Sequence, residues 1–306
     1  MANEKKMLAA VVHLTTNLWR EADPLDKGGD PLKLASGALR CDEALLDEYA
    51  QALAAAGVNT LILDLGDAIA WQTHPEIAVE NAWSVERLRQ KLASLRAMGF
   101  ALIPMLNFST AHDMWLGDAA HMIATVPYYK VCTDLIREVC QIFDYPAYFH
   151  LGWEEESYKA QEDMGLEYIA VRHMDQWWHD FYLFVDRVQG EGARAIFFAD
   201  KMWENPDEFI AQTPTKVVVC HRLDGNSDAD RLACCQTLEE NGYDQLVLYD
   251  GAPDAQRLEQ LKNDVEARIT PAHLLGYAVD PLAVCLPERR EAMLQTAQTV
   301  STLAKE

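Results

Sequence analysis

The sequence contains little glycine and proline, no Cys-x-x-Cys pair and no apolar run long enough to cross a bilayer. Its 15 glycines and 12 prolines are few for 306 residues, of which 50% are hydrophobic. This composition is typical of one large globular domain or two small ones, with ample material for a core. The short apolar stretch 8–12 has no convincing cleavage site after it, so it indicates a first strand and not a signal peptide.

The cysteines exclude a disulfide framework. The seven are odd in number, scattered along the chain and placed mostly inside apolar runs. Such cysteines are typical of small buried residues in a reducing compartment. No cysteine spacing favours a zinc site, so the sequence predicts a cytoplasmic protein without a bound metal.

Positive charge is scarce. The chain has 26 Lys and Arg against 48 Asp and Glu, which gives a formal net charge of −22 at pH 7. A phosphate backbone or an anionic membrane surface would be repelled, so neither nucleic acid nor a membrane is an expected partner. A neutral small molecule fits this charge best, although the acidity could also serve only solubility.

Apolar strand-like runs alternate with helical periodicity from end to end. Gly57, Gly99, Gly192 and Gly242 each end a helical stretch before a strand. The predicted strands are 9–16, 59–65, 101–107, 147–152, 194–199, 216–221, 244–249 and 273–279. The predicted helices are 42–56, 84–98, 128–143, 173–190, 206–212, 229–241, 255–268 and 287–304.

Eight strand–helix units predict a (β/α)8 TIM barrel in a single domain that spans residues 1–306. The strands are nearly continuous apolar runs, as in a parallel sheet covered on both faces, and the length suits a barrel of about 250 residues plus loops. Loop insertions are expected near residues 20–40 and 66–83. A doubly wound open sheet is the alternative, but no Gly-x-Gly-x-x-Gly or P-loop follows a strand, and no cofactor is expected.

Polar and aromatic residues follow the predicted strands, where TIM barrels carry their catalytic residues. Trp faces stack on sugar rings and carboxylates bind hydroxyl groups, so this mixture predicts a site for a small-molecule carbohydrate. The expected substrate-binding residues are Trp19, Asp67, Asn107, His112, Asp113, Trp115, Trp153, Trp203, His221 and Tyr249. Asn17, Asp64, Asp200, Arg222 and Asp280 also follow strands.

The most informative stretch is 148–156 (YFHLGWEEE), where an apolar run leads into three consecutive glutamates. Adjacent carboxylates repel one another, so the pKa of at least one should rise. If the strand continues, alternation points Glu155 away from Glu154 and Glu156. Glycoside cleavage needs one protonated carboxylic acid and a second group at the anomeric centre. The acid would come from this fourth strand, and Asp250, after the seventh, is the best second carboxylate outside the cluster.

Two of these segments resemble the family 20 glycoside hydrolases, the β-N-acetylhexosaminidases. Residues 102–112 (LIPMLNFSTAH) resemble that family's third-strand motif, in which a strand containing Ile-Pro ends in a loop with Pro-Gly-His. Residues 150–155 (HLGWEE) are similar to its His-x-Gly-Gly-Asp-Glu at the fourth strand, and 248–250 (LYD) to its Tyr and Asp near the seventh. The resemblance is strongest over residues 100–156.

The resemblance implies a role for each matching residue. Glu155 matches the general acid, and Glu154 matches the Asp that orients the substrate's acetamido group as nucleophile. His112 matches a supporting His, and Tyr249 a residue that holds the acetamido oxygen. The chain departs from the pattern at Glu154, at Trp153, which replaces a Gly, and after the last strand, where the family's Trp-x-Glu is absent. The predicted activity is hydrolysis of a glycoside of a neutral or N-acetylated sugar.

Two alternatives remain open. The first is a metal-dependent sugar isomerase or hydrolase, although no His-x-His or His-Glu-x-x-His spacing favours it. Its ligands would come from His112, Asp113, Glu155, Asp200, His221 and Asp250. The second is a sugar-binding barrel that has lost its acid, which would explain the altered residue at 154 and the missing final Trp.

Overall fold

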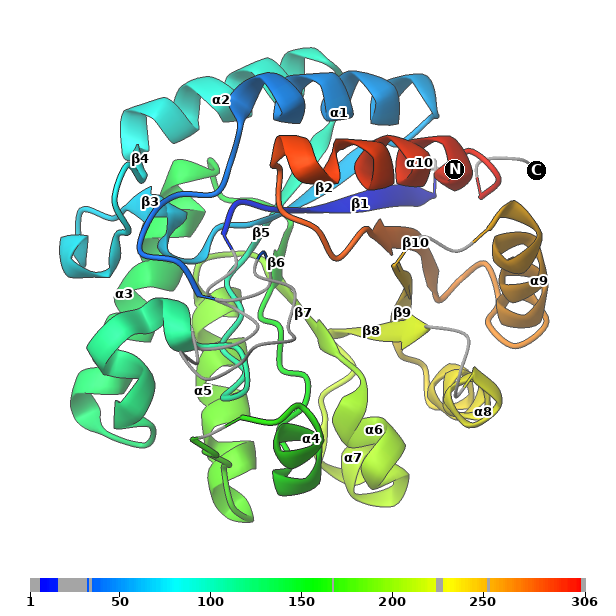
Figure 1. Cartoon of the computed structure of the whole chain (residues 1–306). Helices are drawn as coiled ribbons and strands as arrows, with labels where there is room; N and C mark the ends of the chain where they lie inside the picture. The colour runs from blue at the N-terminus through cyan, green and yellow to red at the C-terminus, as the bar shows by residue number, and fades with distance from the viewer. Residues whose placement is uncertain are drawn as a thin grey trace.

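The computed structural model describes residues 6–15, 32, 35–166, 168–223, 228–251 and 254–303. Eight parallel strands close into a barrel, in the order β1, β2, β5, β6, β7, β8, β9 and β10 around the ring. Figure 1 shows the helices arranged around this ring. The (β/α)8 barrel predicted from the sequence is therefore confirmed.

The barrel strands agree with the predicted ones to within three residues at each end. They are β1 (Met7–His13), β2 (Thr60–Asp64), β5 (Ala101–Met105), β6 (Tyr148–His150), β7 (Arg194–Phe198), β8 (Val218–Leu223), β9 (Asp244–Asp250) and β10 (Leu274–Asp280). Between β2 and the next helix, β3 (Ile69–Ala70) and β4 (Trp83–Ser84) form a separate two-stranded sheet. Most of the expected loop at 20–40 lies outside the described residues.

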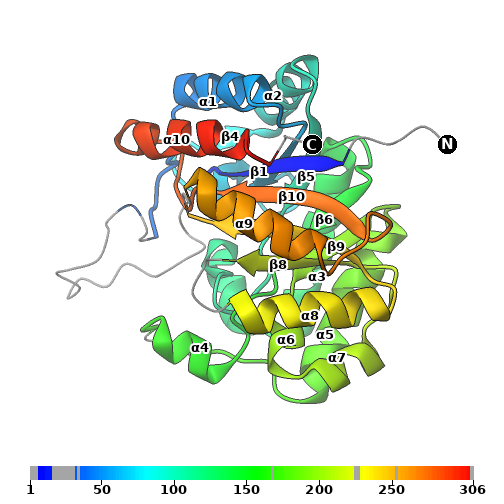
Figure 2. The ribbon, with the colours of Figure 1, turned by 90° about the vertical axis from the view of Figure 1, so that its right-hand side faces the viewer.

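The helices begin where the sequence supplies a capping side chain. Asp42, Ser84, Thr125 and Ser157 each accept a hydrogen bond from the backbone N–H three residues later, at the start of α1 to α4. The helices are α1 (Glu43–Ala55), α2 (Val85–Ala97), α3 (Val126–Ile142), α4 (Tyr158–Asp163), α5 (Asp175–Gly190), α6 (Asp200–Glu204), α7 (Pro206–Gln212), α8 (Asp228–Glu240), α9 (Ala255–Glu266) and α10 (Arg290–Val300). In Figure 2, α8, α9 and α10 lie in a row along one side of the barrel.

Side chains on the barrel strands alternate between the barrel interior and the helix layer. The interior cluster consists of Ala9, Val11, Ile62, Ile103, Met105, Ile196, Phe198, Val218, Cys220, Leu246, Leu248 and Ala278. The residues between them in sequence, such as Val12, Leu63 and Val247, belong to a second cluster shared with the helices. The last interior-facing position of each strand therefore reaches the open end of the barrel.

Short helices and 3-10 turns extend the loops at the carboxyl ends of the strands. The 3-10 segment Met114–Met122 follows β5, and α4 follows β6. Within the described chain, none of the helices has both the length and the apolar character needed to span a membrane.

Candidate active site

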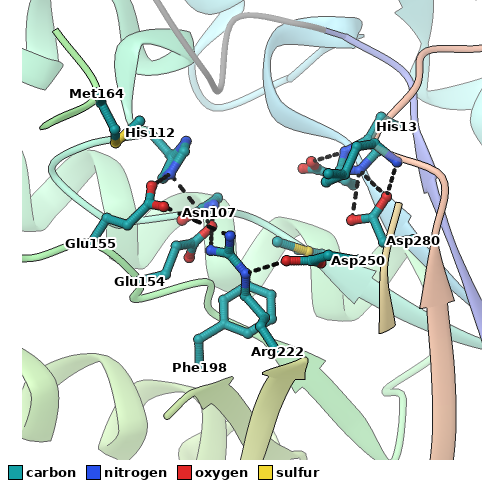
Figure 3. Close-up of a pocket in the computed structure, with 13 residues that line it drawn as sticks. His13, Asn107, His112, Glu154, Glu155, Met164, Phe198, Arg222, Asp250 and Asp280 are labelled. Carbon is teal, nitrogen blue, oxygen red and sulfur yellow. Dashed lines mark hydrogen bonds and ion pairs between the residues drawn. The ribbon is translucent and has the colours of Figure 1, made fainter. Parts of the chain in front are cut away.

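A cavity of about 220 Å³ opens at the carboxyl ends of the barrel strands (Figure 3). Its described lining is rich in charge, with five carboxylates, two imidazoles and one guanidinium group. The lining residues are His13, Asp64, Met105, Asn107, His112, Glu154, Glu155, Met164, Phe198, Arg222, Asp250, Asp280 and Leu282. Five of the predicted site residues, Asn107, His112, Glu154, Glu155 and Asp250, are thus brought together.

The backbone leaves the extended conformation directly after β6. Gly152, Trp153 and Glu155 have φ values of 73°, 80° and 56°. A Cβ atom on Gly152 would lie 1.9 Å from Oδ1 of Asn107, so only glycine fits at this crossing of two loops. Because the strand pattern stops here, Glu154 and Glu155 both line the cavity. Alternation was expected to point these two side chains apart only if the strand continued, and this condition is not met because β6 ends at His150.

Glu154 is buried in the cavity wall. Its Oε1 accepts a hydrogen bond from Nδ2 of Asn107 at 2.9 Å, while its buried Oε2 has no hydrogen-bond partner among the described residues. Burial raises the pKa of Glu154 to about 7, although the charges of His112 and Arg222 act against this rise. Repulsion by Glu155 adds to the rise but is a smaller cause than burial. The expected rise of one glutamate pKa is therefore found at Glu154.

Glu155 has the opposite electrostatic setting. Its Oε2 lies 2.6 Å from Nε2 of His112, and its Oε1 lies 3.7 Å from a guanidinium nitrogen of Arg222. Burial opposes the charge, but the hydrogen bond and charge of His112 and the charge of Arg222 lower the pKa of Glu155 to about 2. Its backbone N–H donates to Oδ1 of Asp200 at 2.9 Å. Glu155 is thus a fixed, ionised carboxylate.

His112 is the cation that joins the two glutamates. Its Nε2 lies 3.7 Å from Oε1 of Glu154, in addition to the short contact with Glu155. Burial favours the neutral imidazole, but the charges of Glu154 and Glu155 raise the pKa of His112 to about 9. The imidazole is therefore protonated at neutral pH.

Glu156 points away from the cavity into a buried ion-pair network. It accepts from the backbone N–H of Thr110 at 2.7 Å and from Arg172 at 2.6 Å. Arg172 also donates to Asp180 at 2.8 Å, and its guanidinium carbon lies 4.5 Å from the ring centroid of Trp153. The third glutamate therefore fixes the loop after β6 to its surroundings and does not face the cavity.

The other wall of the cavity comes from β1, β2, β8, β9 and β10. Nε of Arg222 donates to Asp250 at 2.9 Å. His13 lies between two carboxylates, 2.7 Å from Asp64 and 3.0 Å from Asp280. Burial opposes the charge on this imidazole, but Asp280 and Asp64 raise the pKa of His13 well above its usual value. Figure 3 shows His13 and Asp280 across the cavity from Glu154 and Glu155.

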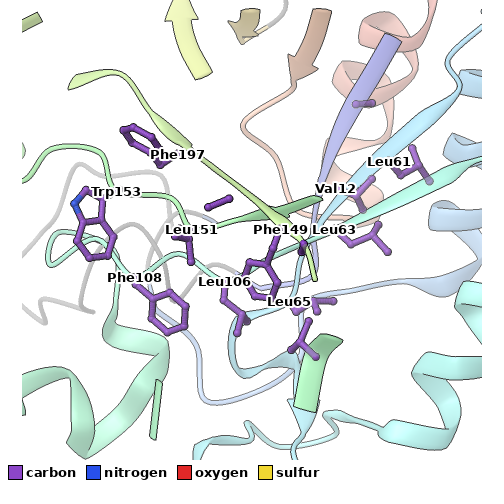
Figure 4. Packing of buried hydrophobic residues seen from close by; sticks show 14 of the residues in the cluster. Val12, Leu61, Leu63, Leu65, Leu106, Phe108, Phe149, Leu151, Trp153 and Phe197 are labelled. Atoms are coloured by element: carbon purple, nitrogen blue, oxygen red, sulfur yellow. The ribbon is translucent and has the colours of Figure 1, made fainter. Parts of the chain in front are cut away.

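Two of the tryptophans predicted to bind substrate lie in the core. Trp153 is 1% exposed, and Figure 4 shows it among the buried hydrophobic residues. Its ring centroid is 5.2 Å from that of Phe184 on α5. Trp115 is equally buried, and its Nε1 donates to the carbonyl oxygen of Asn107 at 2.7 Å. Neither lines the cavity, so the structure gives no support to the prediction of substrate contact for either. Large apolar rings are more stable packed between strand and helix than exposed at the rim.

His221 and Tyr249 face the helices, since each is one position out of phase with the interior row. His221 bonds to Oε1 of Gln245 at 2.9 Å, and burial lowers its pKa to about 4. The ring of Tyr249 stacks on Tyr277 at 6.2 Å between centroids. Neither residue lines the cavity, contrary to the expectation of substrate binding.

Asp67 and Asp113 are also absent from the cavity wall. Both are buried, and burial raises the pKa of Asp67 to about 7 and that of Asp113 well above its usual value. Trp203 borders an adjoining pocket of about 410 Å³, which shares Glu155, Met164 and Arg222 with the main cavity. The guanidinium carbon of Arg231 lies 4.2 Å from the Trp203 ring centroid.

Trp19, also predicted to bind substrate, and Asn17 lie outside the described residues. The structure therefore reports nothing on either side chain.

Four of the charged cavity residues were not among the site residues selected from the sequence: His13, Asp64, Arg222 and Asp280. Each is the second residue after an interior apolar position, respectively Val11, Ile62, Cys220 and Ala278. Counting in steps of two along the strand would have found them. In the described part of the chain, no group of three or more His, Cys, Asp or Glu side chains is arranged to hold a metal ion.

No protein-family model matches the sequence, and no curated protein sequence matches it. Solved structures do match. The family 20 exo-β-N-acetylglucosaminidase of Vibrio harveyi, determined with N-acetylglucosamine, has a TM-score of 0.62 and 12% identity and covers 99% of this chain. The N-acetyl-β-hexosaminidase of Streptomyces plicatus has a TM-score of 0.64 and 10% identity over 96% of this chain.

The chain spans 55% of the length of the Vibrio protein and 63% of the Streptomyces protein. Dispersin B matches along nearly its whole length, with a TM-score of 0.61, 14% identity and coverage of 98% of this chain and 99% of its own. The fold of this chain is therefore a divergent form of the fold found in family 20 glycoside hydrolases.

Proposed function

We propose that the cavity hydrolyses a glycosidic bond, with Glu154 as the proton donor and Glu155 as an ionised carboxylate near the anomeric centre. The observation that carries this proposal is the contrast between the two glutamates. They line one cavity, yet the pKa of Glu154 is raised to about 7 and that of Glu155 is lowered to about 2. Carboxyl groups whose pKa values are pushed apart are the usual acid and base pair of a glycosidase.

In this mechanism, protonated Glu154 gives its proton to the oxygen of the leaving group. Its Oε2 is the free oxygen, because Asn107 holds Oε1. As the bond breaks, positive charge develops on the sugar, and the carboxylates of Glu155 and Asp250 stabilise that charge. A water molecule then adds to the anomeric carbon and gives a proton to Glu154, which is ionised after the first step, so that the acid is regenerated. His112 and Arg222 keep Glu155 ionised and oriented.

This assignment reverses the one that the family resemblance implies, in which Glu155 is the acid. A carboxyl group with a pKa of about 2 is ionised at every pH at which the protein would work, so it holds no proton to donate. Solved structures of similar fold include β-N-acetylhexosaminidases, which supports a sugar as the substrate.

The test compares Glu154→Gln and Glu155→Gln on aryl glycosides with good and poor leaving groups. Glu154→Gln should lower kcat/KM by about 10²- to 10⁴-fold on poor leaving groups and much less on good ones, because only poor leaving groups need the proton. Glu155→Gln should lower it on both. Glu162→Gln, on the exposed face of α4, is the matched control and should leave the rate unchanged.

Near-wild-type hydrolysis of poor leaving groups by Glu154→Gln would show that another residue is the acid. Sugar binding in calorimetry, without product from any glycoside of the panel, would instead identify a carbohydrate-binding barrel.

A further inference from the structure

Glu155 has a backbone conformation that residues with a side chain rarely adopt. Its φ is 56°, in the left-handed region, where the Cβ atom of an L-residue lies too close to the following carbonyl oxygen. Such a conformation persists only where the surrounding structure holds it. It also decides where the carboxylate lies, because in an extended chain Glu155 would point opposite to Glu154. The residues that hold the Glu155 backbone therefore affect the site.

Two side chains hold the backbone of Glu155, one at each end of the residue. Oδ1 of Asp200 accepts a hydrogen bond from the Glu155 backbone N–H at 2.9 Å. Nε2 of Gln161 donates to the Glu155 carbonyl oxygen at 3.4 Å. Asp200 is the first residue of α6, which follows β7, and Gln161 is on α4, which follows β6. The loops of two neighbouring strands thus hold one residue between them.

Gln161 is itself fixed on several sides. It is 0% exposed, and its Nε2 also donates to Oγ1 of Thr110 at 2.9 Å and to the carbonyl oxygen of Ala170 at 2.8 Å. Its Oε1 accepts from the backbone N–H of Ala170 at 3.0 Å. The contact with Glu155 is the longest of these, so the hydrogen bond to Asp200 is the stronger constraint on the Glu155 backbone.

We propose that Asp200 is a positioning residue: by accepting the Glu155 N–H, it holds Glu155 in the left-handed conformation and so places the carboxylate in the cavity. There Oε2 of Glu155 lies 2.6 Å from Nε2 of His112. Asp200 borders the adjoining pocket but is not in the described lining of the main cavity, so it acts through Glu155. The inference rests on the proposed function, in which the Glu155 carboxylate stabilises charge at the anomeric centre.

The test compares two substitutions that both remove the charge of Asp200. Asp200→Asn keeps an oxygen that can accept the Glu155 N–H, whereas Asp200→Leu has a similar shape without an acceptor. Asp200→Leu should lower kcat about 10- to 100-fold on good and poor leaving groups alike, because a displacement of about 1 Å can cost about 10²-fold. KM should change little, since the charge on the sugar develops only in the transition state. Asp200→Asn should stay within about threefold of the wild type.

Asp207→Leu is the matched control. Asp207 also lies in the first turn of a short helix, α7, but it is exposed, so its substitution should leave kcat unchanged. A second check combines Asp200→Leu with Glu155→Gln. If Asp200 acts only through Glu155, the double variant should be no slower than Glu155→Gln alone. A further loss would show that Asp200 has a role of its own, such as contact with the substrate, and would overturn the inference.

A crystal structure of Asp200→Leu gives a readout that does not depend on turnover. We expect the Glu155 carboxylate to have left its contact with His112. An unchanged Glu155, or equal rates of Asp200→Leu and Asp200→Asn, would overturn the inference. If Asp200→Leu does not fold, Asp200→Ala takes its place, because it also lacks the acceptor. Failure of both to fold would assign the hydrogen bond to structure and would equally overturn the positioning role.

The two proposals fail in different ways. If Glu155→Gln retains the wild-type rate, the role proposed for Glu155 is wrong and the glycosidase mechanism fails. If Glu155→Gln is slow but Asp200→Leu is as fast as the wild type, only the positioning role of Asp200 fails.

Discussion

At the scale of single residues, the site depends on the difference between Glu154 and Glu155. They are neighbours in sequence and chemically identical, so nothing in their own side chains distinguishes them. The difference comes from partners distant in the chain, Asn107 for one and His112 with Arg222 for the other. The sequence could therefore locate the glutamate cluster but could not assign the roles within it. Those roles depend on distances that form only in the folded barrel.

The pH dependence of activity should report the Glu154 proton. The rate requires the protonated acid, so kcat/KM should fall as the pH rises through about 7. Ionisation of Glu155 should impose no acid limb above about pH 2. The measurement is a pH profile of kcat/KM for a glycoside with a poor leaving group. The limb near pH 7 should be missing in Glu154→Gln, and its persistence in that variant would assign it to another group.

At the scale of elements, the strands were predictable and the loops after them were not. Apolar runs of five to seven residues predict the strands. Glycines with positive φ, such as Gly57 and Gly99, mark the end of the helix that precedes a strand. The sequence also shows which residues of a strand face the barrel interior, because side chains alternate along it. Nearness to the strand end alone favoured His221 and Tyr249, which face the helices, over Arg222, which lines the cavity. The turn after β6 was missed because φ values of 80° and 56° at Trp153 and Glu155 have no local sequence signal.

Gly152→Ala tests the crossing of the loops after β5 and β6. The added Cβ would meet Asn107 at 1.9 Å, so Asn107 must move away from Glu154. We expect a loss of about 1–3 kcal/mol in unfolding free energy and a lower kcat/KM. Gly165→Ala is the control, because Gly165 has a similar φ of 71° and open space around its Cβ position. Equal effects of the two substitutions would mean that backbone strain alone explains the loss.

Arg172→Met tests the network that fixes the β6 loop to α5. The side chain of Arg172 is completely buried and pairs with Glu156 and Asp180. Its removal leaves two buried carboxylates uncompensated, so urea denaturation should show a loss of about 3–5 kcal/mol. Arg137→Met is the control, since Arg137 is half exposed, its ion-pair contacts are 3.7 Å or longer, and such exposed pairs are worth about 0–1 kcal/mol. A loss at Arg172 no larger than at Arg137 would contradict the importance of the network.

At the scale of the whole molecule, the barrel was predictable because eight repeats of one pattern leave few other architectures. The charged cavity was not predictable as a unit, because its members lie between His13 and Asp280 and meet only when the barrel closes. Closure also buries several groups whose pKa values then differ from those in the unfolded chain. The stability of the whole protein should therefore depend on pH.

We expect the unfolding free energy to decrease as the pH rises from about 5 to about 9. Glu154 and Asp67 have folded pKa values near 7, above their ordinary values, so their contribution to stability is lost as the pH rises towards 7. His112, with a pKa of about 9, and His13 contribute stability that is complete below about 6.5 and is lost above it. Urea denaturation across this range measures the effect. Added salt should not remove it, because these groups are buried; a constant or rising free energy would contradict it.

The alternation of side chains along the barrel strands creates two kinds of position, and substitutions at them have different consequences. At the open end, one residue in two faces the cavity and its neighbour faces the helices, as Asp280 and Val279 do on β10. Substitutions at the first kind of position can alter which ligand is accepted, while the scaffold at the second kind stays intact. The same architecture can therefore carry cavities of different lining, and the solved structures that share this fold are only 10–14% identical to the chain.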